Sequence, residues 1–371
     1  MIRVLNIISD TNIGGAGRVI LNYLYCADKS RFETLVALPR GGMLKAPLEE
    51  AGARVLEVDG MADRSYHRDD VKALKALLRQ EKPDLVHTHG CFSGRIAARS
   101  CGIPVVYSRH SPFPIPAKLR HPPGRWVNKW VNEHYADRII AVSPFAKDNL
   151  VQGGISPEKI VVITNGAAPL AAPTPEQRRQ ARSAFGFGPD DFVAGILARV
   201  IKYKGHDTAL DALELLIAQG RPVRLLIAGQ GEYLEEVRRR AGALPEGSVV
   251  LAGFIQEVER VLWAMDVQLN ASYESEGTSL SLLEGMSMGL PAIVTNCGGN
   301  PWVVEDGENG LIFPMRDSAA LARAIARLMD HPEDRARMSG RAKEIFQARF
   351  TGEVFARTVE QIYLDILKGD K

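Results

Sequence analysis

Two glutamates, Glu276 and Glu284, bracket the start of a predicted helix in the second half of the chain. The helix is predicted from about Thr278, where apolar residues recur at helical spacing after Ser-Glu-Gly-Thr-Ser. The first turn of a helix has unpaired backbone N–H groups and the positive end of the helix dipole, so it can bind an anion. A ligand with phosphate in the middle and a polyol at each side fits between the two carboxylates. A nucleotide sugar has this layout.

A simpler interpretation makes Glu276 a helix-capping acid and Glu284 a solvated surface residue. It leaves the Gly-Thr-Ser entry to the helix unexplained. It also leaves unexplained the strands predicted on either side, Val267–Asn270 and Ala292–Thr295. We therefore expect the two carboxylates to face a ligand.

Two cations, Arg199 and Lys204, follow the predicted strand Phe192–Leu197. Ligands of parallel sheets bind beyond the carboxyl ends of the strands, which is where these two residues fall. Two cations there suit a diphosphate, because charge-assisted hydrogen bonds are stronger than neutral ones. Loop cations are more often merely solvated, so the assignment depends on Glu276 in the same half of the chain.

Glycines that would allow close approach of the backbone to a ligand follow two predicted strands. Gly14 and Gly15 come after the first strand, and Gly229 comes after Val223–Ala228. The first group is a poor dinucleotide fingerprint, because a third glycine is missing and the next strand does not end in an acid. A NAD-binding domain is therefore not expected.

Three histidines lie at or after predicted strand ends. His110 follows the strand Val105–Ser108 and is the better catalytic candidate. His87 and His89 alternate along another strand and could form a metal-binding pair, although the further ligands of a metallohydrolase barrel are not recognisable. Histidines at the edge of a cleft are the favoured interpretation. No Asp-x-Asp pair ends a strand, so no divalent-metal site for a phosphate is predicted.

Length and composition indicate a globular protein. The 371 residues are long enough for two domains, and a net charge of +2 is too small to suggest a nucleic-acid partner. No apolar run approaches the roughly 20 residues of a membrane span, and the N-terminus reads as a buried strand instead of a signal peptide. The four cysteines show no metal-type spacing, which favours reduced thiols and a cytoplasmic location.

Strands and helices alternate through both halves of the chain, which predicts an α/β protein with two doubly wound parallel sheets. A stretch rich in Pro and Ala, 167–175, interrupts the alternation and marks a linker. We expect an N-terminal domain at 1–168, a C-terminal domain at 169–350 and a final amphipathic helix within 351–371. The ligand site is then expected in a cleft that the two domains face.

A basic segment rich in proline, from Ser111 to Arg125, precedes Trp126 and Trp130. It could bind an acceptor or lie on a membrane surface. Alternatively, Trp126–Tyr135 forms a helix whose aromatic side chains pack into the first domain.

The residues around the two glutamates resemble the retaining glycosyltransferases of family 4, which have the GT-B fold of two Rossmann-like domains. The family motif is two glutamates separated by seven residues, and Glu276 and Glu284 match it. Further matches extend over most of the chain: Gly14-Gly15, Ala141-Val-Ser143, Thr164-Asn-Gly166, Arg199 with Lys204-Gly205, Gly229-Gln-Gly231, Gly289-Leu-Pro291, Gly298-Gly-Asn-Pro301, Glu305-Asp-Gly307 and Gly310-Leu311. The resemblance also implies that the final helix crosses back onto the first domain.

The resemblance implies a role for each matching residue. Arg199 and Lys204 would neutralise the donor diphosphate, and Glu284 would bind the ribose hydroxyls. Glu276 would hold the donor sugar near its 3-hydroxyl, and His110 would touch the sugar or the developing charge. The remaining donor contacts would come from Gly14, Gly15, Gly229, Gly277, the N–H groups of Thr278, Ser279 and Leu280, and the backbone of Gly253-Phe-Ile255.

Three departures from the family pattern are visible: Thr278 replaces a common aromatic, Trp302 a frequent Glu, and Ala198 a Gly. None removes a charged site residue, and Trp302 is expected to reshape the donor or acceptor pocket.

The resemblance implies a metal-independent hexosyltransferase without a cofactor, whose substrate is a nucleotide-sugar donor, most simply a UDP-sugar. The acceptor would be a glycan, a lipid-linked molecule or a small molecule, as in polysaccharide biosynthesis. The protein would be cytoplasmic, with peripheral association at the membrane face left open. The alternatives are a nucleotide-sugar 2-epimerase on the same fold and a non-catalytic sensor of nucleotide sugars. The four charged residues Arg199, Lys204, Glu276 and Glu284 argue against the sensor.

Overall fold

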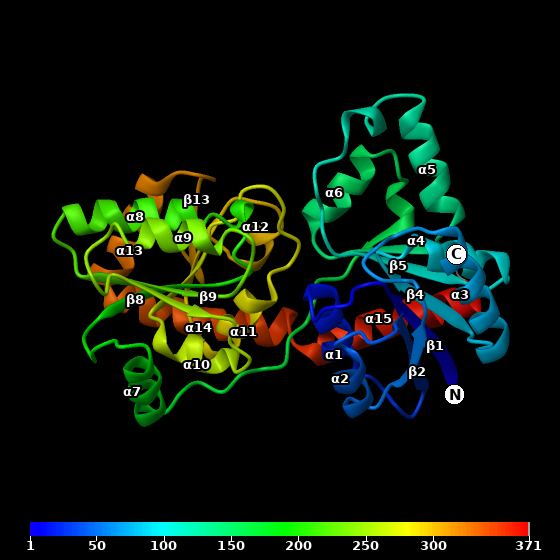
Figure 1. Ribbon diagram of the computed structural model, residues 1–371, viewed down its shortest axis with the longest axis horizontal. Coiled ribbons are helices and arrows are strands. Elements are labelled where there is room, and N and C mark those ends of the chain that lie inside the picture. The colour runs from blue at the N-terminus through cyan, green and yellow to red at the C-terminus, as the bar shows by residue number, and fades with distance from the viewer. Residues whose placement is uncertain (370–371) are drawn as a thin grey trace. The chain divides into compact units, whose positions relative to one another are not determined.

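The computed structural model describes residues 1–369, and it divides into two compact units (Figure 1). The first unit comprises Met1–Ala167 together with the chain from Phe350 onward, and the second comprises Ala168–Arg349. Each unit contains a parallel sheet with helices around it, which confirms the predicted α/β class. None of the helices formed by residues 1–369 is long and apolar enough to cross a membrane.

The first unit contains a seven-stranded sheet in the order β3-β2-β1-β4-β5-β6-β7, with every neighbouring pair parallel. The central strand β1 pairs with β2 through Ile2↔Phe32 and with β4 through Val4↔Leu85. The inner strands are buried along nearly their whole length, because helices cover both faces of the sheet. The strands are β1 (Ile2–Ile8), β2 (Phe32–Pro39), β3 (Arg54–Val58), β4 (Leu85–His89), β5 (Val105–Arg109), β6 (Arg138–Ala141) and β7 (Ile160–Val162).

The helices of the first unit begin where local sequence favours it. Ser143, for example, caps α6 by accepting a hydrogen bond from the N–H of Ala146, and Pro144 occupies the first helical position. The helices that precede the C-terminal one are α1 (Gly15–Cys26), α2 (Lys45–Glu50), α3 (Arg68–Glu81), α4 (Phe92–Ser100), α5 (Gly124–His134) and α6 (Pro144–Gln152), with short 3-10 turns η1 (Ala117–Leu119) and η2 (Pro157–Lys159).

The second unit contains a six-stranded parallel sheet in the order β10-β9-β8-β11-β12-β13. Its strands are β8 (Phe192–Leu197), β9 (Val223–Ala228), β10 (Val249–Gly253), β11 (Val267–Asn270), β12 (Ala292–Thr295) and β13 (Gly310–Phe313). The strand order places β8 directly beside β11, although more than 60 residues separate them in the chain. This adjacency brings the loops that follow the two strands together.

Helices alternate with the strands of the second unit. The first helix, α7, precedes β8 and begins with a capping box between Thr174 and Gln177, directly after the Pro- and Ala-rich stretch. The helices are α7 (Pro175–Ala184), η3 (Lys202–Lys204), α8 (His206–Ala218), α9 (Leu234–Ala241), α10 (Val258–Ala264), α11 (Leu280–Met288), α12 (Asn300–Val303), α13 (Ser318–Asp330) and α14 (Pro332–Arg349).

The chain then returns to the first unit in α15 (Gly352–Lys368), as expected of the final helix. Its Tyr363 is fully buried and contacts Tyr23 of α1 and Phe32 of β2 edge-on. Gly352 comes so close to α1 that an added Cβ would lie 2.6 Å from the sulfur of Cys26. Helix α15 is therefore part of the core of the first unit.

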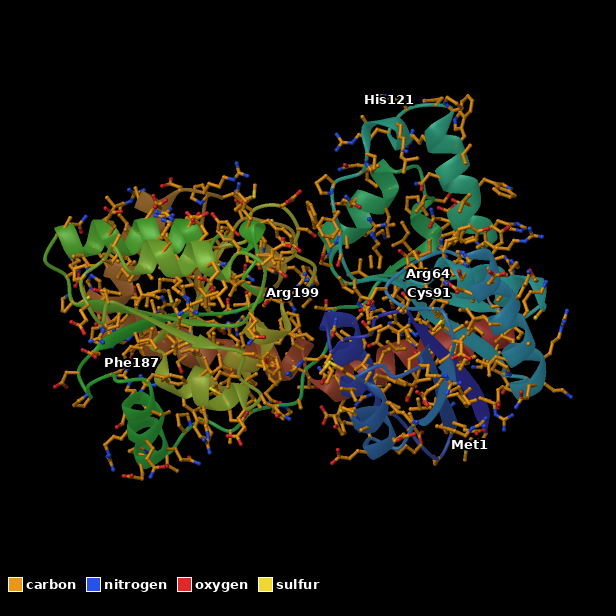
Figure 2. The ribbon with its side chains drawn as sticks, in the orientation of Figure 1. Met1, Arg64, Cys91, His121, Phe187 and Arg199 are labelled. Carbon is orange, nitrogen blue, oxygen red and sulfur yellow. The ribbon has the colours of Figure 1, made fainter. Side chains whose placement is uncertain are left out.

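The prediction that the helix Trp126–Tyr135 packs its aromatics inward is wrong. The helix α5 exists, but it has no buried residue, and Trp126 and Trp130 are 67% and 58% exposed. Polar residues, among them Asn128, attach the helix to the unit instead. His121 lies at the outer end of the preceding segment, away from the sheet (Figure 2).

Candidate active site

Glu276 lies in the loop that joins β11 to α11, and its side chain is enclosed by protein. The residue is 6% exposed. Its Oε2 accepts three hydrogen bonds, from Lys204 Nζ at 2.7 Å, Ser272 Oγ at 2.8 Å and Asn270 Nδ2 at 3.1 Å. Lys204 comes from the loop after β8, so the pairing of β8 with β11 produces this cluster. The carboxylate is thus paired and hydrogen-bonded, as a buried charge must be.

A second layer of polar residues holds this loop from behind. Asn300 Nδ2 donates to Thr295 Oγ1 at 3.2 Å, and Thr295 Oγ1 donates to the carbonyl of Ser272. The N–H of Gly299 donates to the carbonyl of Glu276 at 2.9 Å. Gly298 has φ +58° and an added Cβ would lie 2.2 Å from that carbonyl oxygen, so glycine is required there. These contacts fix the position of the Glu276 backbone.

The charge of Glu276 depends on its neighbours. Burial by itself would raise the pKa of the carboxyl group, but the Lys204 ammonium and the hydrogen bonds from Asn270 and Ser272 outweigh it. The net result is a pKa below the ordinary value, so Glu276 is ionised at neutral pH. The site therefore holds a fixed negative charge and a fixed positive charge in direct contact.

Helix α11 begins at Leu280, two residues later than predicted, and Ser279 is its N-cap. The Ser279 side chain makes no capping hydrogen bond; its Oγ is 3.1 Å from Ser281 Oγ. The backbone N–H groups of the first turn are therefore not used by a side-chain cap. Thr278 and Gly277 are buried beside Glu276 in the loop, and Glu284, one turn into the helix, is half-buried.

The loop after β8 presents Arg199 and Lys204. Arg199 is exposed, and its Nη2 donates to Tyr203 Oη at 3.2 Å. The carbonyl of Tyr203 accepts from the N–H of Tyr273 at 3.0 Å, which joins this loop to the one that carries Glu276. Tyr203 was missed by the sequence argument; its place between the two cations was the available signal.

Gly229 and Gly231 follow β9 and have a packing role. An added Cβ on Gly229, at φ +146°, would lie 1.9 Å from the carbonyl oxygen of Ala198, and one on Gly231 would lie 2.2 Å from that of Val200. Both glycines thus let two loops at the sheet end approach each other. Ile255, after β10, packs against the core of the second unit. Ligand contacts of Gly229 and Ile255 stay predictions.

The three histidines of the first unit are hydrogen-bonded to one another and to neutral groups. His89 Nδ1 is 2.9 Å from His110 Nε2, and His89 Nε2 is 3.0 Å from Asn6 Oδ1. His87 Nδ1 is 2.7 Å from the hydroxyl of Tyr363 and its Nε2 is 2.8 Å from Ser108 Oγ.

Burial lowers the pKa of all three histidines, to about 3 for His87 and about 4 for His110. His87, which contacts Tyr363 of α15, and His89 are both buried, so neither lies at an exposed edge. Nδ1 of His110 has no partner within residues 1–369, so His110 stays the catalytic candidate of this group.

Gly14 and Gly15 also belong to the first unit. Gly15 is the first residue of α1, and Gly14 is its N-cap without a side-chain capping bond. Space for a Cβ exists at both positions. The second unit thus brings together Arg199, Lys204, Glu276, Gly277, Thr278, Ser279, Leu280 and Glu284, while Gly14, Gly15 and His110 lie in the first unit.

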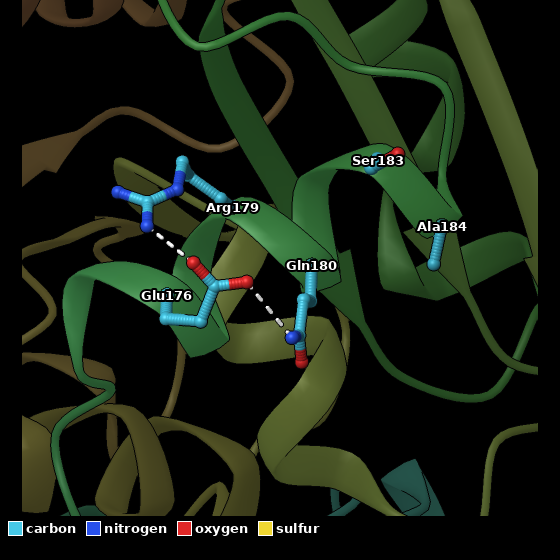
Figure 3. A pocket seen from close by; sticks show the side chains of 5 residues that line it. All are labelled: Glu176, Arg179, Gln180, Ser183 and Ala184. Atoms are coloured by element: carbon cyan, nitrogen blue, oxygen red, sulfur yellow. Dashed lines mark hydrogen bonds and ion pairs between the residues drawn. The ribbon is translucent and has the colours of Figure 1, made fainter.

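Two further features carry no candidate residue. A shallow hollow lies along α7, lined by Glu176, Arg179, Gln180, Ser183 and Ala184 (Figure 3). Glu176 is ion-paired with Arg179 and accepts from Gln180 Nε2 at 2.9 Å, so its charge is satisfied locally. Across the described 369 residues no group of three or more His, Cys, Asp or Glu could hold a metal ion, and the four cysteines are free thiols.

Comparison with family models matches both parts of this architecture. Residues 13–169 match the model "Glycosyltransferase Family 4", and residues 191–331 match "Glycosyl transferases group 1". The chain belongs to the glycosyltransferases of this family, and its two parallel-sheet units are those of the GT-B fold.

Named relatives agree with this assignment. The putative glycosyltransferase EpsD of Bacillus subtilis (strain 168) is 29% identical over 78% of this chain and 78% of its own length. The UDP-Gal:alpha-D-GlcNAc-diphosphoundecaprenol alpha-1,3-galactosyltransferase of Escherichia coli is 26% identical over 86% of this chain and 85% of its own.

Solved structures share the fold at low sequence identity. A glycosyltransferase from Rickettsia africae ESF-5 superposes with a TM-score of 0.85 at 19% identity, covering 99% of each chain. Anabaena Alr3699/HepE in complex with UDP-glucose superposes with a TM-score of 0.83 at 23% identity, covering 98% of this chain and all of that one.

Proposed function

We propose that this glycosyltransferase moves a hexose-type sugar from a UDP-sugar to a hydroxyl of a glycan or lipid-linked acceptor, with retention of the anomeric configuration. The observation that carries the proposal is the buried, ionised Glu276 in contact with Lys204, directly before the first turn of α11. A substrate with sugar hydroxyls next to a diphosphate would contact the Glu276 carboxylate, the Lys204 ammonium and the helix N-terminus together.

The diphosphate would bind to the cations and the helix end. An ammonium group has three N–H donors, and Lys204 directs one of them to Glu276. It can therefore keep this bond and still donate to phosphate oxygens. The guanidinium of Arg199 can donate in parallel to two oxygens. The N–H groups of Thr278, Ser279 and Leu280 would add the favourable dipole of the helix end.

The sugar and the nucleoside would bind on either side of the diphosphate. Glu276 would accept a hydrogen bond from a hydroxyl of the donor sugar, and its charge would favour the positive charge that develops at the anomeric carbon. Glu284, one turn into α11, would accept from the ribose hydroxyls, and the backbone at Ile255 would meet the base. Gly14, Gly15 and His110 would complete the donor contacts from the first unit.

In the proposed reaction the bond between the anomeric carbon and the diphosphate oxygen breaks, and the acceptor oxygen forms its bond on the same face of the sugar. The acceptor proton passes to the departing phosphate oxygen, so the products are the glycosylated acceptor and UDP. Arg199, Lys204 and the first turn of α11 stabilise the charge on the leaving diphosphate. We propose that these groups make a divalent metal unnecessary.

The relatives support a UDP-linked donor. The Escherichia coli relative is named for UDP-Gal and for a diphosphoundecaprenol-linked acceptor. Anabaena HepE was solved with UDP, with UDP and glucose, and with UDP-glucose. A lipid-linked acceptor is consistent with the first of these names.

A panel of UDP-, GDP- and TDP-sugars would test the proposal, first by thermal shift and then by release of free nucleotide. A ligand at 100 times its dissociation constant stabilises the fold by about 2.7 kcal/mol, which a melting curve detects. For the donor that binds, the anomeric configuration of the product is read by NMR coupling constants. Stabilisation by UDP-sugars and a retained configuration are expected. An inverted product, or the conversion of donor into its 2-epimer without UDP release, would contradict the proposal.

A further inference from the structure

Most of the exposed large apolar side chains of the second unit gather at the carboxyl ends of its strands. Within residues 168–349 the exposed ones are Leu215, Phe254, Trp302 and Met315. Phe254 follows β10, Trp302 lies in α12 after β12, and Met315 follows β13. Only Leu215 of the four lies elsewhere, on α8. Because ligands of parallel sheets bind at this end, exposed apolar groups there suit contact with a ligand.

Trp302 is connected to the loop of Glu276 through the backbone. The N–H of Gly299 donates to the carbonyl of Glu276 at 2.9 Å, and the N–H of Trp302 donates to the carbonyl of Gly299 at 3.1 Å. Two successive hydrogen bonds thus lead from the tryptophan to the residue with the buried carboxylate. Helix α12 therefore places Trp302 beside the candidate active site.

Arg349 holds the indole ring of Trp302 in one orientation. Its guanidinium carbon lies 4.4 Å from the ring centroid, and its Nη2 donates to the carbonyl of Trp302 at 2.9 Å. Its Nη1 donates to Glu305 Oε1 at 2.8 Å. The cation is attracted to the face of the ring that it covers, while Trp302 stays 40% exposed. A ring fixed in this way loses little conformational entropy when a ligand packs on it.

The shape and surroundings of the exposed ring indicate the class of ligand. A pyranose ring has C–H groups on its faces and hydroxyls around its edge, so a face can pack on indole while the hydroxyls stay hydrated. The segments on both sides of Trp302 contain exposed polar residues, Asn296 and Asp306. A lipid chain that covered them would remove their water without replacing its hydrogen bonds. A sugar ring therefore fits better than a lipid chain.

The order of the strands indicates which sugar ring this is. In the proposed function the base lies after β10, the diphosphate after β8 and the transferred sugar at Glu276 after β11. The sheet order β10-β9-β8-β11-β12-β13 continues from there to the segments that carry Trp302 and Met315. The group that adjoins the transferred sugar in the reaction is the acceptor.

We propose that Trp302 is the platform on which a sugar ring of the acceptor stacks, so that the acceptor presents a pyranose at its reacting end. Trp302 is then a specificity-determining residue for the acceptor, and Arg349 is a positioning residue that acts through it. The inference rests on the proposed function, from which it takes the place of the donor, and it adds the class of the acceptor.

Acceptor kinetics test the proposal. With the UDP-sugar that is turned over, UDP release is measured against methyl pyranosides of glucose, galactose, mannose and N-acetylglucosamine, and against glycerol as a non-sugar alcohol. Pyranosides should stimulate release more than glycerol does. W302A should raise the KM of the stimulating pyranoside by about tenfold or more, and leave UDP affinity and donor hydrolysis without acceptor unchanged.

Two further variants control for the loss of exposed apolar surface. W302F keeps an aromatic ring and should recover most of the acceptor binding. L215A removes an apolar side chain of nearly the same exposure, 39% against 40%, from the same unit. It should behave as the unchanged protein does. Melting temperatures of all variants show whether a loss of binding is a loss of fold.

The positioning role of Arg349 has its own readout. The chain has four tryptophans, so W126F/W130F/W263F retains Trp302 as its only reporter. In this background R349Q should lower the fluorescence anisotropy of the indole and raise the acceptor KM, with kcat unchanged, whereas R349K should restore part of both. R341Q, an arginine of the same helix that pairs with Glu344, should change neither.

The same reporter detects binding without turnover. In saturating UDP, a stimulating pyranoside should change the emission of Trp302, and NMR saturation transfer from the indole should reach the ring C–H protons. An unchanged acceptor KM in W302A, a raised donor KM instead, or equal stimulation by glycerol would each overturn the inference. If no UDP-sugar is turned over, the proposed function fails, and titration with the pyranosides alone still decides whether a sugar stacks on Trp302.

Discussion

In the second unit a buried carboxylate, Glu276, is paired with the cation Lys204. In the first unit the side-chain hydrogen bonds of the buried His87 and His89 and the half-buried His110 join them, within residues 1–369, to one another, a tyrosine, a serine and an asparagine. Burial opposes charge in both places, because a charged group loses hydration when protein surrounds it. Glu276 nevertheless keeps its charge and the histidines do not. The difference lies in the partners that the fold supplies.

This contrast separates what the two groups of residues can do at neutral pH. The Glu276 cluster offers permanent charges, which can position a polar substrate and stabilise charge that develops on it. The histidine cluster offers neutral nitrogens, which can donate or accept hydrogen bonds and add no charge.

The largest effect is expected from removing the cation. Lys204→Met leaves Glu276 buried without a counter-charge, and breaking a buried ion pair in this way costs about 3–5 kcal/mol. We expect the free energy of unfolding in urea at pH 8 to fall by that amount.

The pH dependence of this loss has a definite sign. In the unchanged protein the pKa of Glu276 is lowered, so its contribution to stability is present above the unfolded pKa and is lost in acid as pH falls through the folded pKa. In the variant the unopposed burial should raise the folded pKa, so the destabilisation should shrink as pH falls. Lys204→Met combined with Glu276→Gln should recover part of the stability. If the double variant instead loses as much free energy of unfolding as the two single variants together, the two residues are not coupled.

The buried histidines should make the stability of the folded protein decrease in acid. The pKa of His87 is lowered to about 3 and that of His110 to about 4 by burial, so below the ordinary value near 6.5 only the unfolded chain takes up these protons. Stability should therefore decrease between pH 6.5 and pH 4, by up to about 1.4 kcal/mol per histidine for each pH unit. Urea midpoints at pH 7 and pH 5 measure it.

A matched pair of substitutions identifies the source of that acid sensitivity. His87→Gln should reduce the difference between pH 7 and pH 5, whereas His121→Gln, at an exposed position, should leave it unchanged. An equal effect of both variants would assign the acid sensitivity to other groups.

Substitution of the two glutamates, Glu276 and Glu284, should change different kinetic parameters. Glu276→Gln removes a charge that matters most as the diphosphate departs, so kcat should fall by about 10²-fold with little change in UDP affinity. Glu284→Ala would remove the proposed ribose contact, which would be similar in ground and transition states, so the donor KM should rise by about tenfold instead. Initial rates and UDP calorimetry distinguish them. Near-normal kcat in Glu276→Gln with UDP weakened as in Glu284→Ala would reverse the roles.

A smaller effect is expected at the exposed cation. Arg199→Ala should weaken UDP binding by about 1.5–3 kcal/mol, the value of a hydrogen bond to a charged group, and leave uridine binding nearly unchanged. Tyr203→Phe removes only the hydroxyl that Arg199 contacts, so it should weaken UDP by about 1 kcal/mol or less. Equal losses for UDP and uridine in calorimetry would contradict a diphosphate role.

No effect at all is expected from a chelator. If Arg199, Lys204 and the first turn of α11 provide the positive charge, transfer should continue at the same rate in excess EDTA. Loss of activity in EDTA that Mg²⁺ or Mn²⁺ restores would show that a metal shares this role.

Much of the fold could be predicted because apolar periodicity is local. The strands Phe192–Leu197, Val223–Ala228 and Val267–Asn270 have the same bounds in the structure as in the prediction. The charged candidate residues Glu276, Arg199 and Lys204 could be chosen from the sequence because they follow strands of a parallel sheet, where ligands usually bind. The contact between Lys204 and Glu276 was not predictable in the same way, because it depends on β8 lying beside β11.

The orientation of α5 could not be predicted from the periodicity of the sequence. A repeat shows that Trp126 and Trp130 share one side of a helix, but it does not show whether that side meets the core or the solvent. The direction was decided by Asn128 and Asn132, which found partners in Gly153 and Arg95. The same limit applies to Tyr203, whose role depends on the neighbour that its hydroxyl reaches.

The return of α15 to the first unit affects the order in which the chain can fold during synthesis. Residues 168–349 are continuous and contain the whole second unit. The first unit needs Tyr363 for its core and for the hydrogen bond to His87, and α15 is translated only after the second unit. Domains of a growing chain usually fold in their order of synthesis. Here the first unit to emerge from the ribosome is the last that can complete its core, and its unfinished surface must stay soluble meanwhile.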